Sequence, residues 1–411
     1  MRFDQYNFLP KIKDNLKDLG FIRPTDIQFK AIPPILKGED VLAIAQTGTG
    51  KTAAFAIPVI NHIVENQKAV KKGHIRCLVL EPTRELSIQI TEVFQSIAKG
   101  TNLKVLNLHG GVEQDPQIKK LKEGVDVLIS TPGRMFDLIH QGYVELGFVE
   151  TFIIDEADHM LDLGFLKDIK DVIRKLPDRR QTLFFSATIN PTIKKLAYDI
   201  VRNAIRIQIS PENPVNKNID HKVGFIEMDD KRFFLERLVH EIPESTILVF
   251  VRTQVRAERV CKAMERAKIH SETIHGGKDQ QERQRALEAF KKGENKILIA
   301  TDVSARGIDI ANVEYVVNYD LPELPENYVH RVGRTGRGGK KGQAVAFCSK
   351  EEIPLLRAIE DYIGTKVEVL KIDKTDYVDT ISFTEDENMN DWKTLLKEED
   401  ESPVKKKNKK K

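Results

Sequence analysis

The sequence predicts two α/β domains in tandem, each built on a parallel sheet, with a cleft between them. Short apolar runs alternate with longer amphipathic stretches, a pattern typical of βαβ units. The segment SPENPVNKN at 210–218 interrupts this pattern with two prolines and several Asn, and the alternation restarts after it. We therefore expect two lobes over 1–209 and 219–366, a linker at 210–218, and an active cleft between the lobes.

The apolar runs give the strands that we expect in each sheet. The first domain contains VLAIA (41–45), CLVL (77–80), VDVLIS (125–130), FII (152–154) and TLFFS (182–186). The second contains ILVFV (247–251), KILIA (296–300), VEYVVN (313–318) and QAVAFC (343–348). Short apolar runs of this kind indicate buried strands.

The end of the chain, 367–411, has a different composition. Residues 385–401 carry eight acidic residues against two lysines, and SPVKKKNKKK follows. Charge blocks that are poor in apolar residues predict a disordered charged tail.

Composition favours a cytoplasmic enzyme or binding protein. An apolar content of 40% allows real cores, and a charged content of 31% keeps the chain soluble. The net charge is only +3, so any basic surface for nucleic acid must be local. No apolar stretch approaches the roughly 18 residues of a membrane span, and the first residues lack a signal-peptide core. Cys77, Cys261 and Cys348 have no metal-ligand spacing, which indicates buried thiols in a reducing compartment.

The segment AQTGTGKT, 45–52, predicts a phosphate-binding loop. It follows the strand VLAIA and precedes the apolar stretch AAFAIPVI, which is the strand-loop-helix context such a loop requires. Lys51 would meet the β- and γ-phosphates, and the Thr52 hydroxyl would ligate Mg²⁺. Ala45 replaces the first glycine of the general pattern. The alternative is a chance glycine-rich turn.

The segment FIIDEADHML, 152–161, places three carboxylates directly behind an apolar run. Ligands of open α/β sheets bind at the carboxyl ends of strands, and a divalent cation there would offset the repulsion. We expect Asp155 to ligate Mg²⁺ directly or through water, and Glu156 to orient or deprotonate the attacking water. Asp158 would make contacts between motifs. The alternative is an acidic loop that opens a helix.

The segment HRVGRTGR, 330–337, places Arg331, Arg334 and Arg337 at helical spacing in the second domain. An arginine brought from another domain stabilises the charge of a transferring phosphate, an effect worth roughly 10³–10⁵ in rate. A solvated basic helix is the alternative.

Together these motifs, in this order, resemble those of the DEAD-box ATP-dependent RNA helicases over about 1–366. The name of that family is the tetrapeptide Asp155-Glu156-Ala157-Asp158. The resemblance implies two RecA-like domains, ATP and Mg²⁺ as cofactors, and RNA-stimulated ATP hydrolysis. Hydrolysis would be coupled to domain closure on RNA, with local unwinding or RNP remodelling. It also implies sequence-tolerant RNA binding, a monomeric core, and ribosomal or RNA-decay proteins as partners.

The resemblance implies an ATP site that both domains build. Gln28 would read adenine, with Phe21 packed on the ring and Phe3 supporting the site. The ATP-binding residues it implies are Phe21, Gln28, Gln46, Thr47, Gly48, Thr49, Gly50, Lys51, Thr52, Gly307 and Asp309. The catalytic residues it implies are Lys51, Asp155, Glu156, Arg334 and Arg337.

The same resemblance implies an RNA site and a coupling motif. The RNA-binding residues would be Arg84, Gly110, Gly111, Thr131, Arg134, Arg252 and Thr301. Gln280 and Arg283 would lie on the RNA side as well. Ser186 and Thr188 would hydrogen-bond toward Asp158 and His330 and thereby couple hydrolysis to strand separation. The lysine-rich tail is either an electrostatic RNA anchor or a solubilising segment.

Three other functions share part of this pattern. An ATP-gated RNA clamp would carry identical motifs, and only a strand-separation assay distinguishes it. A DNA translocase is disfavoured by the adenine-reading glutamine and by the DEAD tetrapeptide. A non-catalytic scaffold is disfavoured by the intact Lys51, Asp155, Glu156, Arg334 and Arg337.

Overall fold

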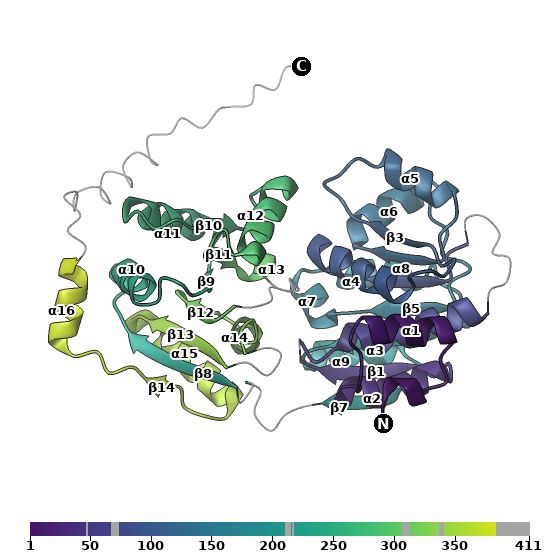
Figure 1. Ribbon diagram of the computed structural model, residues 1–411, viewed down its shortest axis with the longest axis horizontal. Helices are drawn as coiled ribbons and strands as arrows, with labels where there is room; N and C mark the ends of the chain where they lie inside the picture. The colour runs from purple at the N-terminus through teal and green to yellow at the C-terminus, as the bar shows by residue number, and fades with distance from the viewer. Residues whose placement is uncertain are drawn as a thin grey trace, which may run out of the picture.

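The computed structural model describes residues 1–46, 48–66, 74–209, 215, 218–305, 313–336 and 341–383. They form two α/β domains that lie side by side, each a parallel sheet with helices on both faces (Figure 1). The predicted linker, 210–218, lies mostly outside the described residues. The two-domain α/β architecture predicted from the alternation of apolar runs is therefore confirmed.

The first domain has a seven-stranded parallel sheet in the order β3-β4-β2-β5-β6-β1-β7. Its strands are β1 (Val41–Ala45), β2 (Cys77–Leu80), β3 (Val105–Leu108), β4 (Val127–Ser130), β5 (Thr151–Ile154), β6 (Gln181–Ser186) and β7 (Ile205–Ile209). Its helices are η1 (Phe3–Gln5), α1 (Pro10–Asp18), α2 (Asp26–Leu36), α3 (Lys51–Glu65), α4 (Arg84–Ile97), α5 (Asp115–Lys122), α6 (Pro132–His140), α7 (Ala157–Asp162), α8 (Leu166–Ile173) and α9 (Pro191–Ile200).

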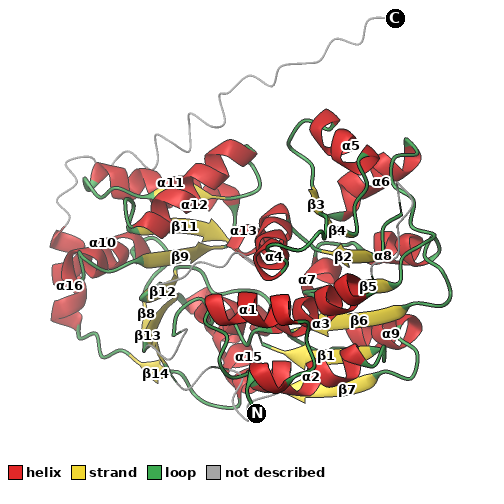
Figure 2. Ribbon diagram, turned by 45° about the vertical axis from the view of Figure 1, so that its right-hand side comes forward, coloured by secondary structure: helices red, strands yellow, loops and turns green. Residues whose placement is uncertain are grey.

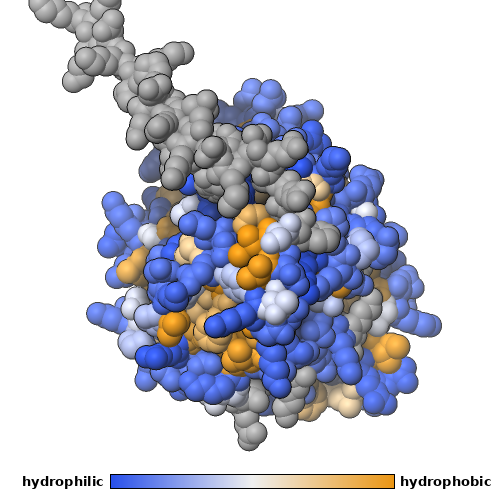
Figure 3. All heavy atoms as spheres, turned by 90° about the vertical axis from the view of Figure 1, so that its left-hand side faces the viewer, coloured by the Kyte–Doolittle hydropathy of each residue, from blue (hydrophilic) through white to orange (hydrophobic). Residues whose placement is uncertain are grey.

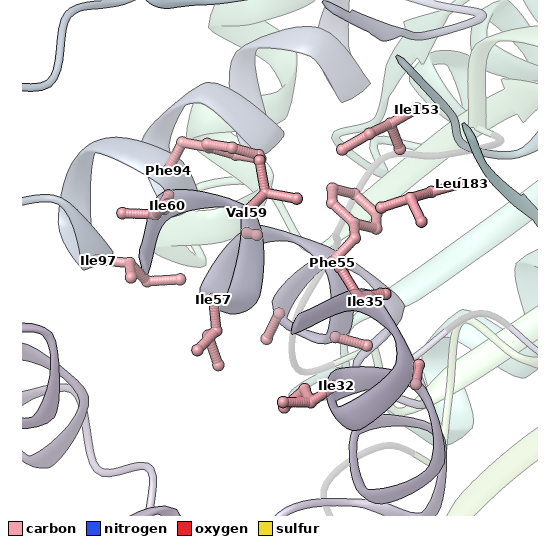
Figure 4. Packing of buried hydrophobic residues seen from close by; sticks show 14 of the residues in the cluster. Ile32, Ile35, Phe55, Ile57, Val59, Ile60, Phe94, Ile97, Ile153 and Leu183 are labelled. Atoms are coloured by element: carbon pink, nitrogen blue, oxygen red, sulfur yellow. The ribbon is translucent and has the colours of Figure 1, made fainter. Parts of the chain in front are cut away.

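Successive side chains of each strand point to opposite faces of this sheet, so each face has its own hydrophobic core. In β1, Val41 and Ala43 join one buried cluster, while Leu42 and Ile44 join the other. Helices α1 to α4 cover the first cluster, and α5 to α9 cover the second. Figure 4 shows Phe55 of α3 pointing toward Leu183 of the sheet. Burial on both faces explains why the strands are continuous apolar runs.

The second domain repeats the topology of the first. Its strand order is β10-β11-β9-β12-β13-β8-β14, which is the same order with every strand number raised by seven. Its strands are β8 (Ile219–Phe225), β9 (Ile247–Val251), β10 (Glu272–Ile274), β11 (Ile297–Thr301), β12 (Tyr315–Asn318), β13 (Gly342–Cys348) and β14 (Glu368–Val369). Its helices are α10 (Lys231–Glu241), α11 (Gln254–Arg266), α12 (Gln280–Lys292), α13 (Asp302–Ala305), α14 (Pro325–Val332), η2 (Lys350–Glu352), α15 (Ile353–Ile363) and α16 (Lys374–Phe383).

The two domains meet along the carboxyl ends of their strands. Figure 2 shows α4 of the first domain facing α12 and α13 of the second. The outer face of the second domain is mainly hydrophilic, with apolar residues in small separate groups (Figure 3). No helix among the described residues has the length and apolar content needed to cross a bilayer.

The structure differs from the prediction at the C-terminal boundary. Residues 367–383 were assigned to a disordered tail, but β14 pairs with β8 and α16 packs on α10. The Tyr377 ring lies 5.0 Å from that of Phe234, and its hydroxyl donates to Asp230 Oδ2. The apolar residues of α16 do not gather on one helical face, so their pattern is too weak to reveal a helix. The second domain therefore extends to residue 383, and 384–411 lie outside the described residues.

We predict that Tyr377→Ala lowers the free energy of unfolding of the second domain by about 2 kcal/mol. The change removes the ring packing on Phe234 and two hydrogen bonds, one to Asp230 and one from the Glu227 amide. Tyr377→Phe keeps the ring and should cost about half as much. Urea unfolding measures both. Two variants as stable as the wild type would show that α16 does not belong to the folded domain.

Candidate active site between the domains

The phosphate-binding loop joins β1 to α3. Gly48 and Gly50 have φ of 79° and 90°, a left-handed conformation that glycine adopts without strain. A Cβ on Gly50 would also lie 2.5 Å from Nε2 of Gln28. Thr49 closes the loop through a hydrogen bond from its hydroxyl to Gln46 O. Helix α3 begins at Lys51, so its free N–H groups face the loop, as anion binding requires. Thr47 lies outside the described residues.

The predicted adenine-reading residues gather beside this loop. Phe3 is buried and packs edge-on against Phe21 at 5.6 Å, and Phe21 lines the cleft next to the loop. The amide of Gln28 is already engaged: its nitrogen donates to Gly50 O and its oxygen accepts from Thr25 N. Gln28 therefore ties the N-terminal motif to the phosphate loop in this structure. An amide has a second N–H and a second oxygen lone pair, so these bonds do not by themselves prevent it from pairing with adenine.

The predicted acids leave the sheet next to the loop. Asp155 follows β5 directly, and its Oδ1 accepts a hydrogen bond from the Glu156 amide at 2.8 Å. Glu156 has φ of 46°, a left-handed conformation that is rare outside glycine and often marks a functional site. It ion-pairs with Lys51 through an Nζ–Oε1 distance of 2.9 Å. All three side chains are buried.

Burial and crowding shift the pKa values of this cluster. Burial raises the pKa of Asp155 to about 7, because Lys51 offsets only part of the desolvation and Glu156 adds repulsion. Burial would raise the pKa of Glu156 too, but the Lys51 charge and hydrogen bond, with His330 and Arg334, hold it below its usual value. Burial alone would lower the pKa of Lys51, yet the surrounding carboxylates raise it. Lys51 and Glu156 thus form an ion pair beside Asp155, whose pKa is raised by burial.

A fourth acid, Glu81, belongs to this cluster and was missed from the sequence. It follows β2, is fully buried, and has a pKa raised well above its usual value by burial and by Asp155 and Glu156. The signal was present: Glu81 follows the apolar run CLVL as Asp155 follows FII.

The second domain reaches this cluster through the last turn of α14 and the residues directly after it. His330 and Arg334 are buried and lie close enough to Glu156 for their charges to lower its pKa. Arg331 instead points into the second domain, where it binds Asp302, Asn318 and the Asp320 carbonyl. The predicted helical spacing of the arginines is wrong beyond Val332, where α14 ends. Arg337, Gly307 and Asp309 lie outside the described residues.

A cleft of about 560 Å³ joins these parts into one site. Its walls come from both domains. The lining includes Phe21, Gly48, Gly50, Lys51, Thr52, Asp155, Glu156 and, from the second domain, Lys291 and Arg334. A cleft of this size holds a ligand as large as a nucleotide. The cleft thus brings together the predicted ATP-binding residues of the phosphate loop and the two acids, Asp155 and Glu156.

The predicted RNA-binding residues of the first domain lie at the ends of β2, β3 and β4, the neighbouring strands of the sheet. The Arg84 guanidinium lies against Gly110 and Gly111, where a Cβ on Gly111 would come 2.1 Å from Nη1. Arg134 binds Val112 O and Gln117 Oε1. Thr131 begins helix α6, whose free N–H groups favour a phosphate.

The second domain places its predicted RNA residues at the equivalent strand ends. Thr301 ends β11 and pairs with Val251, so it lies beside Arg252, which follows β9. The guanidinium of Arg252 is about one-third exposed and is held by Glu352 Oε1 and Leu321 O. Because the two sheets share one strand order, these residues occupy the places that Arg84, Thr131 and Arg134 occupy in the first domain.

An ion pair joins the two domains beside this row of residues. Arg283 Nη2 of α12 lies 2.7 Å from Oε1 of Glu85 in α4, and Gln280 Nε2 lies 3.4 Å from the same oxygen. Glu85 and Arg283 are largely buried. Gln280 and Arg283, which the resemblance placed on the RNA side, therefore contact the first domain in this arrangement.

The coupling residues form a short chain behind the acids. Asp158 Oδ2 accepts hydrogen bonds from both the amide and the hydroxyl of Thr188, each at 3.0 Å. Ser186 is the last residue of β6, and its hydroxyl donates to Thr188 O rather than to Asp158. Thr188 thus links the acidic motif to the end of β6, as the resemblance implies.

The fold and this site define a nucleoside triphosphatase of two RecA-like domains whose catalytic groups meet across an interface. Two family models match the chain: DEAD/DEAH box helicase over residues 25–196, and Helicase conserved C-terminal domain over residues 230–339. The ATP-dependent RNA helicase RhlB of Shewanella oneidensis is 39% identical over 376 residues, which cover 90% of this chain and 86% of that protein. The chain therefore belongs to the DEAD-box family of ATP-dependent RNA helicases.

Solved structures agree with the fold and also indicate the arrangement of the domains. S. cerevisiae Dbp5 bound to RNA and ADP BeF3 superposes with a TM-score of 0.82, at 32% identity over 92% of this chain and 98% of that one. A Dbp5 variant bound to Nup159, Gle1, IP6 and ADP gives 0.61, at 29% identity over 95% and 100%. Over its whole length the chain therefore superposes better on the complex that holds RNA and ADP BeF3 than on the complex with Nup159, Gle1, IP6 and ADP.

We predict that Asp155→Asn stabilises the nucleotide-free protein more at pH 8 than at pH 5. The folded state holds a proton on Asp155 up to about pH 7, whereas an unperturbed Asp releases it near 3.8. Stability is therefore lost as the pH rises through this window, and the variant avoids the loss. The gain in the free energy of unfolding over wild type should be about 2 kcal/mol larger at pH 8 than at pH 5.

Chemical unfolding at the two pH values measures this difference. Asp199→Asn, at an exposed position of α9, controls for the loss of one negative charge. An equal gain at both pH values would contradict the raised pKa of Asp155.

Proposed function

We propose that this helicase binds Mg²⁺ and ATP in the cleft, closes its two domains on a single strand of RNA, and melts or remodels RNA locally. The observation that carries the proposal is the placement of Arg334 and His330, from the second domain, beside Glu156 of the first. Neither domain holds the whole cluster alone. Hydrolysis therefore depends on closure, and the residues at the neighbouring strand ends make closure depend on RNA.

The described residues fit a magnesium ion. Asp155 and Glu81 are buried acids beside Glu156, and Lys51 is the nearby cation that offsets them within the first domain. Glu81 has no hydrogen-bond partner for either carboxylate oxygen among the described residues. Carboxylates and hydroxyls are the ligand types that Mg²⁺ prefers. Asp155 and the Thr52 hydroxyl would hold the ion, which would neutralise charge on the phosphates.

Lys51 must change partners when ATP binds. Its ammonium pairs with Glu156 in this structure, and phosphate oxygens would draw it away. Glu156 is then released to accept a proton from the attacking water as the water oxygen bonds to the γ-phosphorus. The bond between that phosphorus and the β–γ bridging oxygen breaks, and ADP leaves. Arg334, with Arg337, would stabilise the charge on the transferring phosphoryl oxygens.

The RNA side explains why hydrolysis would respond to RNA. Residues such as Arg84, Arg134 and Arg252, with helix N-termini, are suited to phosphate oxygens and carry little base information. We therefore expect sequence-tolerant binding to the sugar-phosphate backbone, with a preference for RNA from contacts to 2′-hydroxyls. A strand held in a bent path across both domains could not remain paired, so a few base pairs would open.

The protein would act as a cytoplasmic monomer. All three cysteines are free, which is expected in a reducing compartment. Ribosome assembly and RNA decay offer structured RNA as substrate, so ribosomal or RNA-decay proteins are the partners that we propose.

ATP hydrolysis with no nucleic acid, with single-stranded RNA, and with DNA of the same sequence tests the proposal. We expect strong stimulation by RNA and little by DNA. Glu156→Gln should lower the stimulated rate by about 10²–10⁴, because the variant keeps the shape but cannot accept the proton. Equal stimulation by DNA would indicate a translocase, and stimulation without strand separation would indicate a clamp.

A further inference from the structure

Glu81 leaves the sheet beside the predicted metal ligand. It follows β2, and Asp155 follows β5, two parallel strands in which Leu80 pairs with Ile154. The Asp155 amide donates to Leu80 O, and the Glu81 amide donates to Ser130 O, so the backbone fixes both positions. Leu80 and Ile154 belong to the same core cluster, so the next residue of each strand turns to the opposite face, toward α3.

The carboxylate of Glu81 is buried without a partner. It is 0% exposed, and neither oxygen has a hydrogen bond among the described residues. Fully buried acids are rare unless they are paired. Glu352, a buried acid of the second domain, shows the usual situation: it accepts from Lys231, Arg252 and the Leu321 amide. A buried acid with no partner indicates a ligand that completes its hydrogen bonds.

The charge around Glu81 indicates that this ligand carries positive charge. Asp155 and Glu156 are its acidic neighbours, and Lys51, the cation of the cluster within the first domain, already pairs with Glu156. No group of three His, Cys, Asp or Glu side chains in the described part of the chain converges closely enough to bind a metal directly. A metal here would therefore have fewer than three such side chains as direct ligands and would complete its coordination with other oxygens, and Mg²⁺ retains several waters in its sites.

We propose that Glu81 is a positioning residue for the metal of the ATP site, and that its carboxylate accepts hydrogen bonds from water in the Mg²⁺ hydration shell. The proposal rests on the ATP and Mg²⁺ site proposed above. Partners of this kind orient the ligands of a metal and set its affinity without touching it. Asp155 and Thr52 would hold the ion, and Glu81 would hold the water on its sheet-facing side.

Binding of a fluorescent, non-hydrolysable ATP analogue, measured with EDTA and across a Mg²⁺ titration, tests this role. In Glu81→Gln and Glu81→Ala we expect the Mg²⁺ concentration for half-maximal binding to rise about tenfold. Affinity for the analogue in EDTA should stay within about twofold of wild type. Gln has nearly the shape of Glu, so its thermal unfolding midpoint without ligand should be at least that of wild type.

Glu92→Gln is the matched control, because Glu92 lines the same cleft but is exposed. It should leave the Mg²⁺ titration unchanged. An unchanged titration in Glu81→Gln, or an equal loss of affinity with and without Mg²⁺, would overturn the role of Glu81. Wild-type protein that binds the analogue equally well with EDTA and with Mg²⁺ would overturn the metal site itself.

Discussion

The buried end of the first sheet carries more negative charge than it can balance, and the activity of the protein depends on this imbalance. Glu81, Asp155 and Glu156 share the space next to the phosphate loop, and the Lys51 ion pair compensates one of them. A buried carboxylate without compensation destabilises the folded state. The pKa of Asp155, raised to about 7, expresses that cost. In the proposed mechanism a bound cation and Arg334 of the second domain would relieve it, so ligand binding and domain closure would be favoured together.

The repeated topology of the two sheets explains how one closure serves two ligands. In both domains the strands fall in the same order, and the functional residues lie at their carboxyl ends. In the first domain, one half of the sheet edge carries Arg84 and Arg134, and the other half carries the phosphate loop and the acids. In the second domain, one half carries Arg252 and Thr301, and the other half leads to Arg334. The Glu85–Arg283 ion pair lies between these halves. Bringing the edges together would therefore assemble the proposed RNA-binding and ATP-binding residues in one movement.

Much of the fold and of the candidate site could be predicted from the sequence. Parallel strands that are buried on both faces appear as continuous apolar runs, and the motifs follow these runs directly. Three features could not be predicted. Helix α16 holds to the domain mainly through Tyr377 and polar contacts, which leave no apolar period. The three-residue spacing of the arginines hid the end of α14, which falls at Val332 directly before Gly333. The engagement of Gln28 with Gly50 joins segments distant in the chain, which no local pattern reveals.

The reciprocity of ATP and RNA binding tests the account most directly. The affinity for single-stranded RNA would be measured with and without a non-hydrolysable ATP analogue, and the affinity for the analogue with and without RNA. If one closure assembles both sites, each ligand strengthens the other by the same factor, within the range of about 5 to 150 typical of such coupling. Glu85→Gln, which weakens the contact with Arg283, should reduce both factors equally. A factor of one in the wild type would show that the two sites act independently and would contradict the account.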